Sequence, residues 1–481
     1  MKPPIDEATR RRRHRNERIA AAIFVLLAGA GVWLFIRWDA REQAEFERNR
    51  LYIPKAEKIT PEILLLQEYV RIPTITGNER PGAEWLVAQF AKNGVRAELV
   101  ESVPGRFNVY ARIRGKQQGE GLLLLNHIDV VPASEQGWDH PPFSGAIQQN
   151  MLYGRGVLDM KGLAVTQLLA FVAVARSGRV PEHDLVFLAV CDEEEGGEEG
   201  IVALLEKRPD IFAGIRYSLN EGGLSEVIAE RMTYFGIEIG GKQASRVIVS
   251  ADSLEPLRQA RFALQRQTTR REPQRILPEV RALFRKVAPT RARYRKQLSD
   301  IDASVRNGTF WELPHSYREL THDVTLMRWP YEKDGRYQAV VDLFDLPGTS
   351  ADARIRQLAA ELAPFGVRIE RVVTRGATAP LSRTDTPLFR RIITLIETTY
   401  DTTAGTLILA SATNDSRYLR QRGITSYGIL PFPVDAFQSA SIHRANERVR
   451  LDWFVLGVGV MRQLVTGYVF DQPVTESVRT P

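Results

Sequence analysis

A dense run of acidic side chains follows an apolar segment in VFLAVCDEEEGGEEG, residues 186 to 200. Six carboxylates occupy the eight positions from Asp192 to Glu199. Carboxylates this close repel one another unless cations or shared protons compensate their charge. A solvated loop is the simplest interpretation of such a run. The alternative is a cation site, whose other ligands must then come from elsewhere in the chain.

The residues before this run indicate where such a site would lie. Val186 to Cys191 is an apolar run with β-branched and aromatic members, typical of a strand buried on both faces of a parallel sheet. In open α/β sheets, chemistry takes place beyond the carboxyl ends of such strands. Asp192, Glu193 and Glu194 fall at that position.

Four further segments carry a histidine or a carboxylate near the expected end of a strand or the start of a helix. The first, NHIDVVP, places His127 two residues before Asp129, so that the two share one face of a strand and Asp129 can orient the imidazole. The others are Asp159 in YGRGVLDMKG, Glu221 in LNEGG and His443 in SIHRANERV. Taken singly, His127 also fits a structural histidine, and Asp159 fits a helix N-cap.

Together these segments offer two histidines and several carboxylates. Such a set suits zinc better than calcium, which prefers oxygen ligands alone. Two metal ions bridged by one carboxylate need about this many side chains.

The order of the motifs resembles the di-zinc exopeptidase and amidohydrolase family. This family includes aminoacylase, acetylornithine deacetylase, succinyl-diaminopimelate desuccinylase and carboxypeptidases of the glutamate-releasing and yeast vacuolar types. The motifs are NHIDVVP, WDHPPFSG, GRGVLDMKG, DEEEGG, NEGG and IHRANERV, and the resemblance spans roughly residues 60 to 470.

The resemblance implies a site with two zinc ions per chain, for which Co2+ or Mn2+ can substitute. Glu193 would be the general base that takes a proton from water and passes it to the departing amine, and Asp129 would orient His127. Asp192, Glu195, Glu198 and Glu199 would be carboxylates of the loop and the helix start. The implied metal ligands are His127, Asp159 and Glu221 for one ion and Asp159, Glu194 and His443 for the other.

Two positions depart from the family pattern. Gln243, in GGKQASRV, stands where the family has a histidine that reaches the substrate's carbonyl oxygen, and a neutral amide can still donate one hydrogen bond there. Phe344, in VVDLFDLPGT, stands where the family has an arginine that binds a substrate carboxylate. Either the substrate lacks that carboxylate or another cation binds it; the candidates are Lys242, Arg246 and Arg383.

The elements needed to position these residues are readable from the hydrophobic pattern. Residues 59–227 and 376–481 alternate strands with helices, which predicts an α/β domain whose mainly parallel sheet is covered by helices on both faces. Residues 228–375 read as strand, helix, two strands, helix and strand, a split βαβ unit that begins with the strand IAERMTYFGIEI. This inserted α+β unit resembles the family's lid or dimerisation domain, and an Arg-rich helical insertion lies at 270–315.

The first residues differ from the rest in composition. A basic tail, 1–18, precedes an apolar stretch, 19–38, long enough to span a bilayer, and a polar linker follows at 39–58. The positive-inside rule predicts a single-pass anchor with a cytoplasmic N-terminus and a periplasmic or extracellular catalytic domain. A cleaved signal peptide is the alternative, because Ala28-Gly29-Ala30 offers small residues for cleavage, but the apolar run continues beyond them.

The net charge of +7 is concentrated in two segments. Residues 1–18 contribute +4 and residues 251–300 contribute +8, which leaves −5 on the remainder. This distribution does not favour nucleic acid as a partner. The Arg-rich segment is interpreted as a solvated helical face, with contact to anionic lipid headgroups as the alternative. The single cysteine, Cys191, cannot form an internal disulfide.

These features predict a membrane-anchored, zinc-dependent hydrolase of peptide or amide bonds, acting on a peptide or an N-acyl amino acid. Its lid domain would close over the site, and a homodimer paired through this domain is a further expectation. The competing hypothesis is a membrane-tethered binding protein that keeps the metal ligands but no longer turns substrate over.

Overall fold

The computed structural model describes residues 59–228, 231–269, 273–333, 335–376, 378–409 and 412–472. Apart from Arg231, these residues lie in one compact unit formed by residues 53–228 and 232–481. The tail, anchor and linker predicted at 1–58 lie outside the described residues. Within the described ranges, one helical stretch, Val157–Arg176, is long and apolar enough to cross a membrane, but 83% of it is buried inside the protein, as in a core helix.

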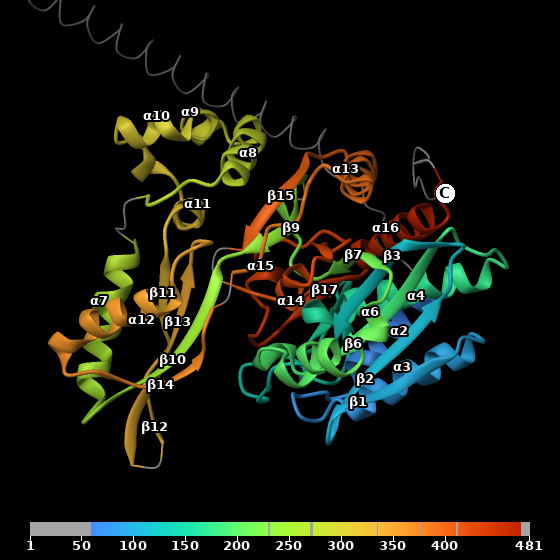
Figure 1. Cartoon of the computed structure of the whole chain (residues 1–481), viewed down its shortest axis with the longest axis horizontal. Coiled ribbons are helices and arrows are strands. Elements are labelled where there is room, and N and C mark those ends of the chain that lie inside the picture. Colours follow the sequence, from blue (N-terminus) through green and yellow to red (C-terminus); the bar gives the residue numbers. More distant parts are fainter. Residues whose placement is uncertain are drawn as a thin grey trace, which may run out of the picture. The chain divides into compact units, whose positions relative to one another are not determined.

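A nine-stranded sheet contains strands from the first and last parts of the chain (Figure 1). Its main path runs β1-β2-β6-β3-β7-β16-β9-β15, and β8 pairs with β9. The strands are β1 (Ala97–Val103), β2 (Arg106–Ile113), β3 (Gln117–His127), β6 (His183–Val190), β7 (Ile215–Asn220), β8 (Leu224–Ile228), β9 (Arg231–Gly241), β15 (Ala404–Leu409) and β16 (Thr425–Gly428).

The sheet is mixed, which corrects the expectation of a mainly parallel one. Its centre, β6-β3-β7-β16, is parallel, and β15 also runs parallel to β9. The pairs β1–β2, β2–β6 and β16–β9 are antiparallel. The short connection between β1 and β2, with Gly105 at a positive φ, permits only an antiparallel pair, since parallel strands need a long crossover.

Helices cover both faces of this sheet, as the alternating pattern predicts. One face packs Leu123, Leu125, Val186 and Leu188 against short helices, because alternate strand residues point to the same side. On the other face the ring of Phe187 contacts the rings of Phe90 and Phe171. The covering helices are α5 (Ala203–Lys207), α6 (Pro209–Phe212) and α14 (Ser416–Gln421) on the first face, and α3 (Arg80–Lys92) and α4 (Gly162–Arg176) on the second.

Helix α4 is apolar on all sides, as its sequence GLAVTQLLAFVAVAR implies, and is buried along most of its length. Helix α16 (Leu451–Val469) packs along it, and both contact α2 (Pro61–Val70). A small three-stranded sheet has the order β17-β5-β4. Strands β4 (Ala146–Gln148) and β5 (Met151–Tyr153) precede α4 in the chain, and β17 (Arg448–Arg450) directly precedes α16. The remaining helices of this part are α13 (Pro387–Tyr400) and α15 (Ala436–Ser439).

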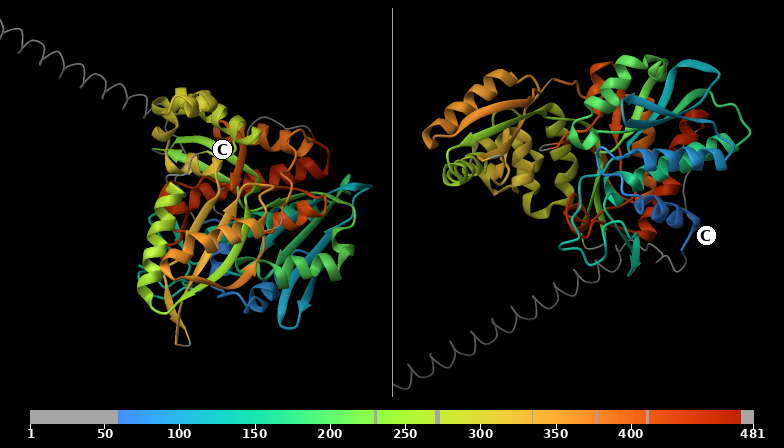
Figure 2. Two further views of the ribbon diagram at one scale, coloured as in Figure 1. Left: turned by 60° about the vertical axis from the view of Figure 1, so that its left-hand side comes forward. Right: turned by 90° about the horizontal axis from the view of Figure 1, so that it is seen from below.

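A separate antiparallel sheet of five strands carries the inserted part of the chain. Its order is β11-β13-β10-β14, with β12 paired to β13. Helices α7 (Leu254–Thr269) and α12 (Ala351–Leu362) pack on one face of this sheet (Figure 2). There Val247, Val341 and Leu343 form a core with Leu257 and Leu358. The strands are β10 (Gln243–Ala251), β11 (Val324–Met327), β12 (Tyr331–Lys333), β13 (Arg336–Asp345) and β14 (Arg368–Thr374).

Residues 231–239 of the expected strand IAERMTYFGIEI belong to the nine-stranded sheet as part of β9, so their assignment to the inserted sheet was wrong. The inserted sheet begins instead with β10, and the order strand, helix, two strands, helix, strand is kept by β10, α7, β11, β13, α12 and β14. The physical reason lies in burial on both faces of β9. Phe235, Ile237 and Ile239 are fully buried, and Glu238 is buried in an ion pair with Arg420.

The Arg-rich insertion is helical, as expected, and has an apolar stripe of its own. Helix α8 (Pro278–Val287) buries Val280, Leu283, Phe284 and Val287, which follow helical spacing. The other helices of this segment are α9 (Arg295–Ser299), α10 (Ile301–Arg306) and α11 (His315–Arg318). Part of the segment is therefore packed rather than wholly solvated.

Candidate metal centre

Three adjacent parallel strands end at the same edge of the nine-stranded sheet, and each brings a candidate residue there. His127 is the last residue of β3, Glu193 and Glu194 follow β6, and Glu221 follows β7 directly. Apolar strand residues fix these ends because they are buried on both faces of the sheet. The carboxyl edge of a parallel sheet is where α/β proteins bind ligands.

Asp159 lies between the two histidines. Its Oδ1 is 3.1 Å from Nε2 of His127, and its Oδ2 is 2.9 Å from Nε2 of His443. The residue sits in the turn before α4, and His443 lies in the loop before β17 at a positive φ of 61°. One carboxylate thus presents one oxygen to each imidazole, which is the arrangement a bridging ligand needs.

The remaining carboxylates complete two neighbouring clusters. Nε2 of His127 is 3.8 Å from Oε2 of Glu221, and Nε2 of His443 is 3.1 Å from Oε2 of Glu194. Ligand atoms of His127, Glu193 and Glu221 all lie within 4.8 Å of one another, and so do those of His127, Asp159 and Glu194. The structure therefore brings together all the residues to which the sequence analysis gave metal-binding and general-base roles.

Asp129 is part of this site, but its main-chain oxygen, rather than its carboxylate, contacts the imidazole of His127. The Nδ1 of His127 lies 2.8 Å from the main-chain oxygen of Asp129, whereas the Asp129 carboxylate is 3.7 Å away. That carboxylate accepts hydrogen bonds from the main-chain N–H groups of Glu193 and Glu194, each at 3.2 Å, and from Thr76 Oγ1 at 3.1 Å. Asp129 therefore orients the imidazole through its backbone and the acidic loop through its side chain.

The electrostatics of the site are those of crowded, buried acids beside two bases. Burial, followed by the charge of Asp159, raises the pKa of Glu221 to about 8. Burial, together with the Glu221 charge, also raises the pKa of Glu193 well above its usual value. Hydrogen bonds to Asp159 and Glu194 raise the pKa of His443 to about 10. A proton on this histidine occupies the direction in which a cation would bind.

The donor set fits a pair of divalent cations. Two imidazole nitrogens and several carboxylate oxygens are borderline ligands of the kind that zinc takes. Oε1 of Glu194 is buried and has no hydrogen-bond partner among the described residues, so it is available to a ligand. Burial and neighbouring negative charges raise the pKa of Glu193 and Glu221, and cations would offset both effects.

Other acidic residues of the run are held outside the cluster. Arg106 pairs with Asp192 at 3.1 Å and with Glu79 at 2.7 Å, and it also contacts Glu199. The Asp192 carboxylate accepts a hydrogen bond from the main-chain N–H of Glu199 at 2.8 Å. These contacts agree with the interpretation of Asp192 and Glu199 as carboxylates of the loop and the helix start.

Glu447 is a buried residue whose role the sequence analysis missed, although it lies in the motif IHRANERV. Its Oε2 accepts hydrogen bonds from Nη1 of Arg155 at 2.7 Å and from the N–H of Gly156 at 3.0 Å. Its Oε1 accepts from the N–H groups of Leu158 at 2.9 Å and Asp159 at 3.3 Å. Glu447 thus ties the loop that carries His443 to the turn that carries Asp159.

Asp415 is a second residue that was not predicted. It is 1% exposed, and neither of its oxygens has a hydrogen-bond partner in the described part of the chain. Burial, offset in part by the charge of Arg417, raises its pKa to about 7. A Cβ at Gly197 would lie 2.5 Å from its Oδ1, so the glycine pair of the acidic loop makes room for this carboxyl group. No local sequence pattern marks it, because it reaches the loop through the fold.

The lid residues are placed differently from the metal-site residues. Gln243 is buried; its Nε2 donates to the main-chain oxygen of Thr349 at 2.7 Å, and its Oε1 accepts from Thr378. Both ends of the amide are therefore engaged, by residues of the connections that follow β13 and β14. Phe344 is 8% exposed and lies opposite Ala244 and Val324 in the strand register.

The three cations considered as replacements for the missing arginine also have partners. Nζ of Lys242 donates to the main-chain oxygens of Glu319 and His322, each at 2.6 Å. Arg246 pairs with Asp342 at 2.6 Å, and Arg383 pairs with Asp385 at 2.6 Å. Each of the three cations therefore already has a partner within the protein.

The fold of the chain is similar to that of several solved structures. An M20 family metallo-carboxypeptidase from Sulfolobus solfataricus superposes with a TM-score of 0.63 at 18% identity, covering 85% of this chain and 99% of that one. Human carnosine dipeptidase 1 gives a TM-score of 0.64 at 16% identity, with 88% and 98% covered. The dipeptidase Dug1p from Saccharomyces cerevisiae gives 0.65 at 14% identity, with the same coverage.

The sequence then identifies the family. Residues 123–467, more than half of the chain, match Peptidase family M20/M25/M40, and the chain belongs to it. The metallo-carboxypeptidase from Sulfolobus solfataricus carries the same family name, M20. A succinyl-diaminopimelate desuccinylase from Methylobacterium radiotolerans is 36% identical over 147 residues, 30% of this chain. One from Blochmanniella pennsylvanica is 32% identical over 147 residues. The chain spans 37% and 38% of the length of these two relatives.

Proposed function

We propose that this protein hydrolyses peptide or amide bonds at a centre of two metal ions. The observation that carries the proposal is the position of Asp159, whose two oxygens face Nε2 of His127 and Nε2 of His443. His127, Asp159 and Glu221 would hold one ion, and Asp159, Glu194 and His443 the other. Zinc fits these ligands, and Co2+ or Mn2+ would substitute for it.

The chain's own residues supply the rest of the chemistry. When bound, the metal ions would polarise the scissile carbonyl group and acidify water. Glu193 would accept a proton from the attacking water and return it to the departing amine, which is the ordinary task of a buried carboxylate with a raised pKa. The Asp129 carboxylate fixes the main chain of Glu193 and Glu194 for this purpose.

The substrate we propose is a peptide or an N-acyl amino acid. The relatives' names support this range, since they include a desuccinylase, a metallo-carboxypeptidase and dipeptidases. With Phe344 in place of the expected arginine, and Arg246, Arg383 and Lys242 engaged elsewhere, we propose that a carboxylate on the substrate is not the main determinant of binding.

We also propose the membrane anchor at 19–38, the extracytoplasmic position of the catalytic domain, and the division into residues 59–227, 228–375 and 376–481. The anchor is supported by the basic tail and the apolar stretch after it. Fusion of a reporter that is active only outside the cytoplasm to the C-terminus should give activity, and inactivity would contradict this topology. Mass photometry in detergent would test a homodimer formed through the inserted domain.

A binding protein without turnover is the second candidate. The engaged amide of Gln243 favours it, because one of its two N–H donors is used by Thr349 and its oxygen accepts from Thr378. The two candidates share the metal ligands and differ in turnover.

Amine release by the full chain in detergent distinguishes them. The substrates are dipeptides, N-acyl amino acids and N-acyl amines without a carboxylate, each with and without a chelator. We expect chelator-sensitive release, with N-acyl amines cleaved at rates comparable to those of N-acyl amino acids. No release from any pool by protein that contains two metal ions per chain would favour the binding protein.

A further inference from the structure

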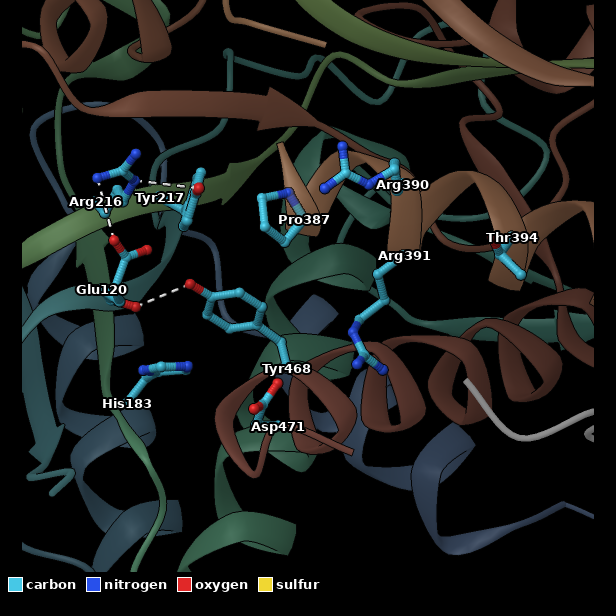
Figure 3. Close-up of a pocket in the computed structure, with 10 residues that line it drawn as sticks. All are labelled: Glu120, His183, Arg216, Tyr217, Pro387, Arg390, Arg391, Thr394, Tyr468 and Asp471. Carbon is cyan, nitrogen blue, oxygen red and sulfur yellow. Dashed lines mark hydrogen bonds and ion pairs between the residues drawn. The ribbon is translucent and has the colours of Figure 1, made fainter. Parts of the chain in front are cut away.

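A pocket of about 560 Å³ lies at the opposite end of the strands that carry the metal ligands. It is lined by Glu120 of β3, His183 of β6 and Arg216 of β7, at the amino ends of these strands, and by residues of α13 and α16 (Figure 3). His127 lies seven residues beyond Glu120 on β3, a separation of about 20 Å along the strand. The pocket is therefore distinct from the metal centre, and its volume is in the range of small-molecule sites.

Two guanidinium groups in this pocket have no ion-pair partner among the residues that the structure describes. Arg216 is neutralised by Glu120, with Nη1 and Oε1 3.1 Å apart. Arg390 instead donates to the main-chain oxygen of Asp385 at 2.8 Å, and Arg391 donates to the main-chain oxygen of Gln472. Within the described residues, neither forms an ion pair. Both lie across the pocket from the Arg216–Glu120 pair (Figure 3).

The guanidinium of Arg391 lies directly against helix α16. A Cβ at Gly467 would lie 2.5 Å from its Nη1, so the absence of a side chain at this glycine leaves room for the guanidinium in its present position. Burial lowers the pKa of Arg391, and the nearby charge of Asp471 opposes that effect. A partly buried cation with incomplete compensation is a binding point for an anion.

The other walls of the pocket are apolar and aromatic. Tyr468 lies between the two charged sides, and its hydroxyl donates to the main-chain oxygen of Glu120 at 2.9 Å. The rings of Tyr217 and Tyr468 are nearly perpendicular, with centroids 5.7 Å apart, and Pro387 lies beside them. These side chains offer a surface for a carbon body and leave few free donors of their own.

The charge selects the class of ligand. The lining has three arginines against Glu120 and Asp471, a net formal charge of +1 with His183 neutral. This balance suits a monoanion, whereas a phosphate dianion would face the two carboxylates without full compensation. We infer that the pocket binds a small organic carboxylate with an aromatic or apolar body, held by Arg390 and Arg391. This inference does not rest on the proposed function.

The test is a fluorine NMR titration of the full chain in detergent with 4-fluorophenylacetate. The protein is treated with chelator, so that bound metal ions cannot hold the carboxylate, and empty micelles correct for partitioning. We expect saturable binding of the acid. Its neutral counterpart, 4-fluorophenylacetamide, should bind at least about tenfold more weakly, since it cannot form a charge-assisted pair with a guanidinium.

Variants locate the site. The Arg390→Gln/Arg391→Gln double variant should weaken binding of the acid by about tenfold or more. Arg422→Gln, which removes an exposed cation outside the pocket, should leave it unchanged. If the double variant fails to fold, Arg390→Gln alone serves, because Arg390 is exposed and should be tolerated. Equal binding of acid and amide, an undiminished affinity in the variants, or displacement of the acid by equimolar inorganic phosphate would overturn the inference.

Discussion

Glu447 should control both the stability of the chain and its affinity for metal, although it is not itself a predicted ligand. It accepts four hydrogen bonds, from Arg155, Gly156, Leu158 and Asp159, and is fully buried. Burial raises its pKa, and the charge of Arg155 and the hydrogen bonds from the main-chain N–H groups offset part of that rise. The substitution Glu447→Gln keeps the shape of the side chain and removes its charge.

The size of the effect follows from these contacts. A glutamine has one acceptor oxygen, so either Arg155 or the main-chain N–H groups of Leu158 and Asp159 must face its NH2 group. Removing one partner of a buried ion pair costs about 3–5 kcal/mol. Substituting a residue that hydrogen-bonds to a metal ligand and holds it in place typically weakens metal binding by about 10–100-fold. We expect both effects, because the altered turn carries Asp159.

Two measurements check this prediction on the full chain in detergent. Thermal unfolding of metal-free protein gives the stability change, and competition with a fluorescent zinc chelator gives the affinity. Glu135→Gln is the matched control, since Glu135 is an exposed carboxylate in a loop. The control should change the free energy of unfolding by less than about 0.5 kcal/mol. If Glu447→Gln behaved like this control in both assays, the proposed link between the two loops would be refuted.

Three further predictions concern other parts of the structure. Although burial opposes the effect, the N–H of Gly115 and the side chain of Arg112 lower the pKa of Asp184, so its stabilisation is present above about pH 4 and is lost as the pH falls through the lowered value. Asp184→Asn should therefore cost about 1.5–3 kcal/mol at pH 7 and less at pH 3 by denaturant unfolding; an equal cost at both pH values would contradict this. Burial raises the pKa of Cys191 to about 12, so iodoacetamide at pH 8 should label it only in unfolded protein, and rapid labelling of the native chain by mass spectrometry would disprove its burial. Gln243→Ala should lower the free energy of unfolding by about 1–3 kcal/mol, because the buried amide bridges Thr349 and Thr378. Its kcat/KM should stay within about tenfold of wild type; a larger loss without lower stability would instead assign Gln243 to the substrate.

Much of the metal site was readable from local sequence. Each ligand-bearing motif follows an apolar run or precedes a helix, and in a parallel sheet such positions meet at one edge. His127, Glu193, Glu194 and Glu221 are therefore brought together by strands β3, β6 and β7, whose apolar runs are visible in the sequence. The arrangement of the second sheet was also recognisable, because its pattern of strands and helices is self-contained.

What was missed depends on contacts between distant parts of the chain. Glu447 acts on Arg155 across 292 residues of sequence, and no local pattern marks such a contact. The sheet that β9 joins is decided by pairing with β15 and β16, which lie more than 150 residues later. The sequence identified Asp129 as the residue that orients His127, but it did not predict which oxygen of Asp129 makes the contact. Strand periodicity does not distinguish a main-chain from a side-chain oxygen as the partner of the imidazole.

The most direct test of a two-metal hydrolase is to compare wild type with Glu193→Gln, measuring metal content and turnover on the same samples. A general base contributes about 10²–10⁴-fold to the rate. We predict two metal ions per chain in both proteins and a loss of turnover of at least this size in the variant. Full turnover by Glu193→Gln, or fewer than two metal ions in an active wild-type chain, would contradict the account of this site.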